Sequence, residues 1–123
     1  MVGTNDLNKS EKFYNKLLDT VGLKKIYSDE ICVGYGQKSG PKIVEFYITM
    51  PANGEPATYG NGTQISFLSN TRAEVDKFHA TGIESGGVCE GLPGLRPEGA
   101  TTYYSYVRDL NGNKVCAYTD SKD

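Results

Sequence analysis

The chain has 123 residues, 37% of them hydrophobic, with 15 glycines, 9 tyrosines and a formal net charge of −2 at pH 7. This length suits one domain, residues 1–123, with a single core. The small acidic charge and interspersed lysines exclude the usual electrostatic basis for binding nucleic acid or an anionic membrane. No apolar run approaches the roughly 20 residues that span a bilayer, so we expect a soluble protein with neither partner.

The cysteines and the start of the chain indicate a location. There are 3 cysteines, an odd number, and none forms a CxxC pair, which is typical of free thiols in a reducing compartment. Polar Asn5 and Asp6 follow the first residues at once, so we expect no signal peptide. The predicted location is the cytoplasm.

The first half of the chain predicts a strand, a helix and three further strands. Residues 1–4 form a strand remnant, and Asn8–Glu11 has the form of a capping box that opens a helix. Gly22 ends this helix, and strands are predicted over 25–28, 31–36 and 42–49. One apolar stripe recurs at helical spacing: Phe13, Tyr14, Leu17, Leu18 and Val21.

The second half repeats that order after a loop rich in proline and glycine at 51–62. A strand over 63–68 precedes a second capping box, Thr71–Glu74, and a helix with Val75, Phe78 and Ile83 on one side. A weak strand is predicted over 86–91 and a loop over 92–99. A final hairpin turns at Asn111-Gly112, where both residues accept positive φ at little cost.

Weak self-similarity supports a duplication. An offset of 65 places Gly22 on Gly87, and an offset of 71 places Tyr35 on Tyr106 and Val44–Tyr47 on Val115–Tyr118. We therefore predict an α+β fold of two βαβββ modules. The first module covers 1–50, the linking loop 51–62 and the second module 63–119.

The final hairpin, TTYYSYVRDLNGNKVCAY, is similar to a known family. Val107-Arg108-Asp109, the Gly-Asn turn and the following Lys-Val-x-Ala resemble the terminal hairpin of the glyoxalase/bleomycin resistance/dioxygenase group, the vicinal oxygen chelate superfamily. The resemblance implies two sheets curved around a shared cleft, with one helix on the outside of each. The alternative, a ferredoxin-like sandwich, explains two helices but not eight strand-like segments.

Alternation along the strands predicts which side chains face the cleft. This alternation, the family's aromatic position and the internal repeat together predict the ligand-binding residues Tyr35, Glu45, Tyr47, Gln64, Ser66, Tyr104, Tyr106, Cys116 and Tyr118. The internal repeat also places Val33 on the cleft face. Tyrosines on an uncovered face bind a ligand or a partner chain, or else form ordinary cross-strand pairs. Arg96 and Arg108 offer anchors for an acidic ligand at the cleft mouth, although surface pairing of Arg108 with a neighbouring carboxylate is the favoured interpretation.

The resemblance also implies a metal site, which this sequence fills poorly. Of the four ligand positions in family enzymes, Glu45 and Gln64 match two, Cys116 replaces a glutamate, and the first falls before Met1. His79, the only histidine, is predicted on the surface of the second helix. We expect no cofactor and no metal; a divalent ion held by Cys116, Glu45 and Gln64 is the less favoured alternative. Glu45 is then the only candidate base.

These observations favour a small-molecule binding protein with a degenerate metal site and a tyrosine-lined cleft. The family resemblance implies a homodimer. One alternative is a divergent, metal-dependent glyoxalase-like lyase or isomerase, and whether the protein is an enzyme stays open. The other alternative is a non-catalytic interaction domain that buries its aromatic face by dimerisation.

Overall fold

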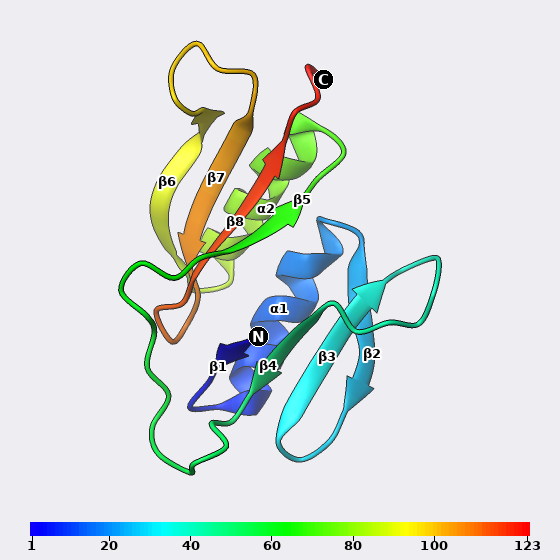
Figure 1. The fold of residues 1–123 in the computed structure, drawn as a ribbon, viewed down its shortest axis with the longest axis vertical. Helices are drawn as coiled ribbons and strands as arrows, with labels where there is room; N and C mark the ends of the chain where they lie inside the picture. The colour runs from blue at the N-terminus through cyan, green and yellow to red at the C-terminus, as the bar shows by residue number, and fades with distance from the viewer.

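A computed structural model describes all 123 residues and contains the sequence β-α-β-β-β twice (Figure 1). The first module contains β1 (Val2–Gly3), α1 (Leu7–Asp19), β2 (Leu23–Ser28), β3 (Cys32–Gln37) and β4 (Phe46–Thr49). The second contains β5 (Ile65–Leu68), α2 (Arg72–Glu84), β6 (Val88–Leu95), β7 (Tyr103–Arg108) and β8 (Lys114–Thr119). The predicted α+β fold of two βαβββ modules is confirmed.

Each module forms its own four-stranded sheet, with the order β1-β4-β3-β2 in the first and β5-β8-β7-β6 in the second. The pairs β1·β4 and β5·β8, at one edge of each sheet, are parallel, and the other pairs are antiparallel. Figure 1 shows the sheets one above the other with both helices behind them. Each sheet therefore has one face under a helix and one face free of helices, and the two sheets do not close into a barrel.

The two helices begin at different kinds of cap. Thr71 caps α2 as predicted, because its hydroxyl accepts a hydrogen bond from the Glu74 amide at 3.2 Å. Helix α1 is capped by Asp6 and not by Asn8: the Asp6 carboxylate accepts from the Lys9 amide at 3.1 Å. Leu7 packs against the core, so the helix begins earlier than the predicted capping box.

One core runs through both modules along a chain of aromatic rings. The centroids of Tyr14 and Phe46 lie 5.1 Å apart, those of Phe46 and Phe67 5.2 Å, and those of Phe67 and Phe78 6.2 Å. This row passes from α1 through β4 and β5 to α2. The two modules are thus packed as one body by apolar contact.

The inner side of α2 differs from the prediction at one position. Val75 and Phe78 are fully buried, but Ile83 is 39% exposed. Gly82 lies on the inner side instead, where a Cβ would meet Val107 at 3.1 Å. A small residue is needed here because α2 packs closely on β7.

The longest helices have 13 residues, and none has both the length and the apolar character to cross a membrane.

The turn between β7 and β8 connects the second module to the first. The Asp109 carboxylate accepts hydrogen bonds from the amides of Asn111 and Asn113, each at 2.9 Å, and the Asn113 side chain donates to the Gly3 carbonyl at 3.0 Å. Within this turn, Gly112 is the residue with a positive φ, of 84°. The prediction of a turn was right, but Asn111 does not adopt the left-handed conformation, because Asp109 organises the turn.

Several strands differ in length from the predictions: β2 begins at Leu23 and not at residue 25, and β5 begins at Ile65 and not at residue 63. β4 is limited to Phe46–Thr49, shorter than the predicted 42–49, although the Glu45 amide still donates to the Tyr35 carbonyl at 2.8 Å. β6 continues to Leu95, through the first part of the predicted loop. Its pairing with β7 shifts on both sides of Gly91. An edge strand tolerates such irregularities and a proline, here Pro93.

Candidate aromatic binding face

The uncovered side of the second sheet carries the candidate site, which we call the open face. The Ser105 hydroxyl donates to the Val75 carbonyl of α2 at 3.0 Å, and Val107, Val115 and Ala117 are buried in the core. Because side chains alternate along a strand, their neighbours on β7 and β8 project away from α2. The open face consists of these neighbours and of the residues paired with them: Ser66, Leu68, Val88, Gly91, Gly94, Tyr104, Tyr106, Arg108, Lys114, Cys116 and Tyr118.

Three tyrosine rings on the open face form a stack. The Tyr104 and Tyr106 centroids lie 5.7 Å apart with 10° between the ring planes, and those of Tyr104 and Tyr118 lie 5.8 Å apart with 25°. Tyr104 and Tyr118 face each other directly across β7 and β8, which fixes their separation. All three rings are half-buried. The face therefore presents aromatic surface that is ordered without a ligand.

A polar cluster adjoins this stack. Ser66 pairs with Cys116 across β5 and β8, and the Cys116 Sγ lies 3.1 Å from the Ser66 Oγ. The Gln64 amide nitrogen lies 2.9 Å from the Ser66 Oγ and 3.5 Å from the Cys116 Sγ. Burial raises the pKa of the Cys116 thiol, against smaller opposing effects of Ser66 and Lys114. The thiol is thus protonated near neutral pH.

Two hollows meet at this cluster. The first has a volume of about 330 Å³ and is lined by Gln64, Ser66, Tyr104 and Tyr118. The second, of about 380 Å³, lies between the modules, where Glu45 and Phe46 of the first module approach Ser66 and Tyr118 of the second. Ser66 and Tyr118 line both hollows. The two hollows together therefore join the tyrosine stack to the boundary between the modules.

Two cations flank the far end of the stack. The Arg96 Cζ lies 5.4 Å from the Tyr106 ring centroid, and the Lys114 Nζ lies 5.1 Å from it. Both distances are within the range of cation–π attraction. Lys114 was not predicted as a site residue, although alternation from Cys116 and Tyr118 along the same strand would have identified it.

Comparison with known proteins identifies the family. The Glyoxalase/Bleomycin resistance protein/Dioxygenase superfamily model matches residues 1–117. The chain belongs to this superfamily. It is 42% identical to a glyoxalase/bleomycin resistance protein from Albidiferax ferrireducens T118, with a TM-score of 0.82 over 97% of this chain and 93% of that one. No curated protein matches the chain.

More distant solved structures share the fold of the superfamily. A glyoxalase-related enzyme from Fulvimarina pelagi is 18% identical, with a TM-score of 0.72 over 96% of this chain and 83% of that one. Glyoxalase I from Zea mays is 21% identical, with a TM-score of 0.69 over 96% of this chain and 43% of that one. At these identities the likeness concerns the fold alone.

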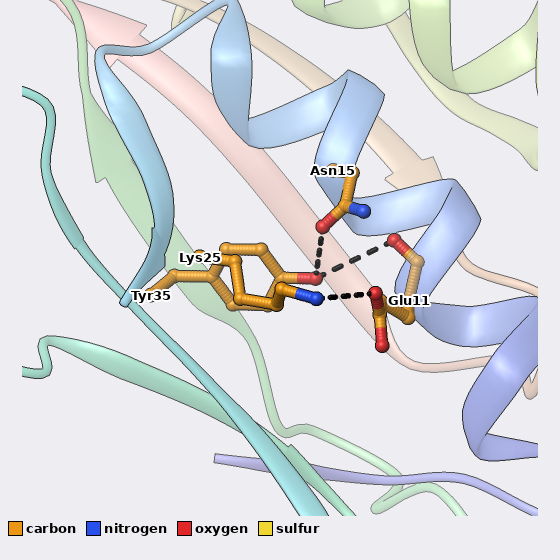
Figure 2. A network of polar contacts seen from close by, with 4 residues as sticks. All are labelled: Glu11, Asn15, Lys25 and Tyr35. Atoms are coloured by element: carbon orange, nitrogen blue, oxygen red, sulfur yellow. Dashed lines mark hydrogen bonds and ion pairs between the residues drawn. The ribbon is translucent and has the colours of Figure 1, made fainter. Parts of the chain in front are cut away.

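Tyr35, predicted to line the cleft of this superfamily member, lies under helix α1 instead (Figure 2). Its ring is fully buried in the core, and its phenolic oxygen donates to the Asn15 Oδ1 at 2.8 Å. Beside it, the Lys25 Nζ and the Glu11 Oε2 form an ion pair at 2.9 Å. The predictions for Tyr35 and for Val33, which is buried on the same side of β3, were wrong.

A register difference between the modules explains this error. The offset of 71 placed Tyr35 on Tyr106. However, Val2 pairs with Ile48 as Phe67, 65 residues later, pairs with Ala117, so Tyr47 corresponds to Cys116. Gly34 pairs with Tyr47, and Tyr106 pairs with Cys116. Gly34 is therefore the counterpart of Tyr106 in the first sheet. A shift of one residue moves every side chain to the other face of a strand. The first sheet consequently presents a glycine where the second presents a tyrosine.

The same pairing separates Glu45 from its predicted counterpart. Tyr47, and not Glu45, occupies the position in β4 that Cys116 occupies in β8. Tyr47 is half-buried against Gly34, where a Cβ would meet its ring at 3.0 Å. Glu45 is exposed just before β4 and lines the hollow between the modules. Glu45 and Tyr47 were both predicted to face the cleft. Of these two, Glu45 lines the hollow that contains Ser66 and Tyr118.

The three positions that correspond to superfamily metal ligands do not form a suitable donor set. Gln64 and Cys116 are in contact with each other, but a neutral amide and a buried thiol differ from the carboxylate and imidazole ligands that a hard or borderline divalent ion prefers. Glu45 is exposed on the other module. No group of three or more His, Cys, Asp or Glu side chains is arranged to hold an ion. That the protein works without a metal stays a prediction.

His79 makes a contact that the sequence did not predict. Its Nε2 lies 3.2 Å from the Sγ of Cys89, which is exposed on β6. The imidazole is half-buried, and this burial lowers its pKa although Asp76 acts in the opposite direction. The two residues lie on different elements, so only the packing of α2 against β6 brings them together. The contact lies on the helix side of the sheet, away from the open face.

Proposed function

We propose that this protein is a small-molecule binding protein that holds a planar ligand against the open face of its second sheet. The tyrosine stack beside the hollow of about 330 Å³ carries the proposal. In this site a flat ligand packs against Tyr104 and Tyr118, and the side chains of Gln64 and Ser66 supply polar contacts at its edge. A largely preformed concave site with a few polar groups is typical of small-molecule binding.

The stack favours binding because its order is already present in the free protein. Each offset-stacked aromatic pair contributes about 0.5–1.5 kcal/mol beyond the burial of apolar surface. Tyr104 lies between two other rings, so a ligand does not have to immobilise it. Less conformational entropy is lost on binding to such a preorganised surface.

The groups around the hollow favour binding over catalysis. The Cys116 thiol is protonated and contacts Ser66 and Gln64, and no histidine lines either hollow. A nucleophilic cysteine needs a base or a lowered pKa, and this one has neither. Glu45 is the carboxylate that lines the hollow between the modules. We infer that it is a polar contact for the ligand.

A titration with naphthalene-1-carboxamide, a neutral planar probe, tests the proposal by isothermal calorimetry. We expect one molecule to bind per chain and Tyr118→Ala to weaken binding about tenfold, the factor that corresponds to 1.4 kcal/mol. Tyr27→Ala is the matched control, because Tyr27 is an exposed tyrosine of the first sheet and should leave binding unchanged. The absence of binding to the unmodified protein, or equal effects of both substitutions, would contradict the proposal.

A second candidate function, self-association through the open face, is favoured by Leu68. Its side chain is 66% exposed and is paired in register with Tyr118, so an apolar surface continues from the stack to the edge strand β5. A second copy of the chain would bury this surface, which fits the homodimer expected from the family. Analytical ultracentrifugation tests it: the unmodified protein should sediment as a dimer and Leu68→Glu as a monomer. A monomeric unmodified protein would refute this candidate.

A further inference from the structure

We propose that Arg96 and Lys114 form an anion-binding pair, and that the ligand of the open face is a planar carboxylate. This inference rests on the proposed function, since it assigns a charge to the molecule that binds there. It makes Arg96 and Lys114 the residues that determine specificity, and Tyr104 and Tyr118 the residues that hold the planar part of the ligand.

The two cations lie within reach of the hollow. Both lie near the Tyr106 ring, at 5.4 Å for the Arg96 Cζ and 5.1 Å for the Lys114 Nζ. Tyr106 stacks on Tyr104, which lines the hollow. The positive charges are therefore one ring away from the place where the ligand stacks. A planar ligand that extends along the stack brings a carboxylate to them.

Neither cation has a carboxylate partner. The ion pairs of the chain are Lys25–Glu11, Lys38–Asp19 and Arg108–Glu90, and they include neither Arg96 nor Lys114. Arg108 faces Lys114 across β7 and β8, but it forms an ion pair with Glu90 at 3.0 Å. The predicted pairing of Arg108 with a neighbouring carboxylate is confirmed. Two cations without carboxylate partners beside the same ring create a local positive potential that attracts an anion.

The remaining charges near the pair do not change its sign. Among the strand residues whose side chains point to the open face, Arg108 and Lys114 are the charged ones, and none is a carboxylate. The hydrogen bond from Arg108 is the main cause of the lowered pKa of the Glu90 carboxyl, and the charge of the nearby Lys114 adds a smaller contribution. The hydrogen bond of Glu90 thus goes to Arg108. The open face is thus positively charged around Tyr106.

Both cations retain unused hydrogen-bond donors. The Arg96 Nη2 donates to the Leu92 carbonyl at 2.5 Å, which leaves most of the five N–H groups of a guanidinium free. The Lys114 ammonium makes no hydrogen bond within the chain. A carboxylate beside the Tyr106 ring has donors available from either group. Such charge-assisted bonds are stronger than those between neutral groups.

Gly91 makes this placement of Arg96 feasible. A Cβ at position 91 would lie 2.7 Å from the Tyr106 Cδ2 and 2.9 Å from the Arg96 Nη2, closer than side-chain atoms approach one another. The pairing of β6 with β7 is also irregular on both sides of Gly91. The bulged strand and the missing side chain together let Arg96 fold back over the Tyr106 ring.

Three probes of the same shape test the inference by calorimetry at fixed ionic strength: 1-naphthoate, naphthalene-1-carboxamide and 1-naphthylmethylammonium. We expect 1-naphthoate to bind about tenfold more tightly than the carboxamide, the lower end for a charge-assisted hydrogen bond, and the ammonium to bind most weakly. Arg96→Gln and Lys114→Gln should each reduce this preference, because each should weaken 1-naphthoate more than the carboxamide. Lys38→Gln, which removes a cation of the first module that is paired with Asp19, should not alter it.

The outcomes separate this inference from the proposed function. Equal binding of all three probes, or tightest binding of the ammonium, overturns the planar-carboxylate assignment and leaves small-molecule binding in place. Failure of all three probes to bind overturns both. Gly91→Ala provides an independent check, since it displaces Arg96 without removing a charge. It should weaken 1-naphthoate more than the carboxamide, and an unchanged preference would contradict the role of Arg96.

Discussion

Tyr14 donates a hydrogen bond from its phenolic oxygen to the Oδ2 of Asp109 at 2.6 Å, and this bond joins the two modules inside the core. Tyr14 is fully buried on α1, and Asp109 is 6% exposed in the turn between β7 and β8. Asp109 also accepts hydrogen bonds from Asn111 and Asn113. The turn next to the binding face is thus fixed by a tyrosine of the other module.

Replacing Tyr14 by phenylalanine should destabilise the whole protein. The substitution leaves a buried carboxylate with one hydrogen bond fewer, which costs about 1–3 kcal/mol. Urea unfolding measures the loss. Tyr27→Phe is the matched control, because Tyr27 donates to Asp29 at the same distance of 2.6 Å but on the exposed surface. Its unfolding midpoint should not change, and equal losses in the two variants would contradict the importance of the buried bond.

Stability should decrease at alkaline pH. Burial, and then Asp109, raise the pKa of Tyr14 well above its ordinary value, and burial also raises the pKa of Tyr35. Because the unfolded state loses these protons at a lower pH, near 10, this contribution to stability is complete below about pH 10 and is lost as the pH rises further. Unfolding free energies measured between pH 8 and 12 should decline less steeply for Tyr14→Phe. An identical decline would show that Tyr14 does not contribute.

Tyr35 and Tyr104 should respond oppositely to truncation. Tyr35→Ala leaves a cavity under α1 and should cost about 3–5 kcal/mol, as for other large aromatic residues in cores. Tyr104→Ala, at a half-buried position, should cost less and should weaken binding of naphthalene-1-carboxamide. Thermal unfolding and calorimetry of both variants measure the two effects. If a stable Tyr35→Ala variant binds the probe more weakly, Tyr35 belongs to the binding site and its assignment to the core is wrong.

The three cysteines should differ in reactivity according to their burial. Cys89 is exposed and lies beside His79, whereas Cys116 is buried. We expect iodoacetamide to modify Cys89 first and Cys116 last, as measured by peptide mass spectrometry over time. Early modification of Cys116 would contradict the assignment of a covered, protonated thiol.

The sequence predicted the helices and the second sheet better than the first sheet. Helical spacing identified Phe13, Tyr14, Leu17 and Leu18, all of which are buried, and Thr71 was the correct cap. Alternation along β8 also placed Cys116 on the open face, because Val115 and Ala117 are apolar enough to define the buried side. These features depend on local patterns of side chains, which a sequence contains directly.

The features that failed depend on register and on contacts between elements. Tyr35 was assigned to the wrong face because the two modules differ in offset by one residue in this strand, which moves Val33 and Tyr35 under the helix. Arg96 was considered as an anchor, but its position over Tyr106 depends on the irregular pairing around Gly91. The segment 92–99 was predicted to be a loop, so that pairing was not foreseen.

Nuclear magnetic resonance of protein with ¹³C-labelled tyrosine rings, titrated with 1-naphthoate, tests the central claim most directly. A planar carboxylate on the open face should shift the ring signals of Tyr104 and Tyr118 progressively and those of Tyr106 at its charged end. The signals of Tyr14, buried on α1, and of Tyr35, buried beneath it, should stay in place. Saturating additions that leave the Tyr104 and Tyr118 signals unmoved, or that shift only tyrosines of the first module, would contradict the assignment of this face as the binding site.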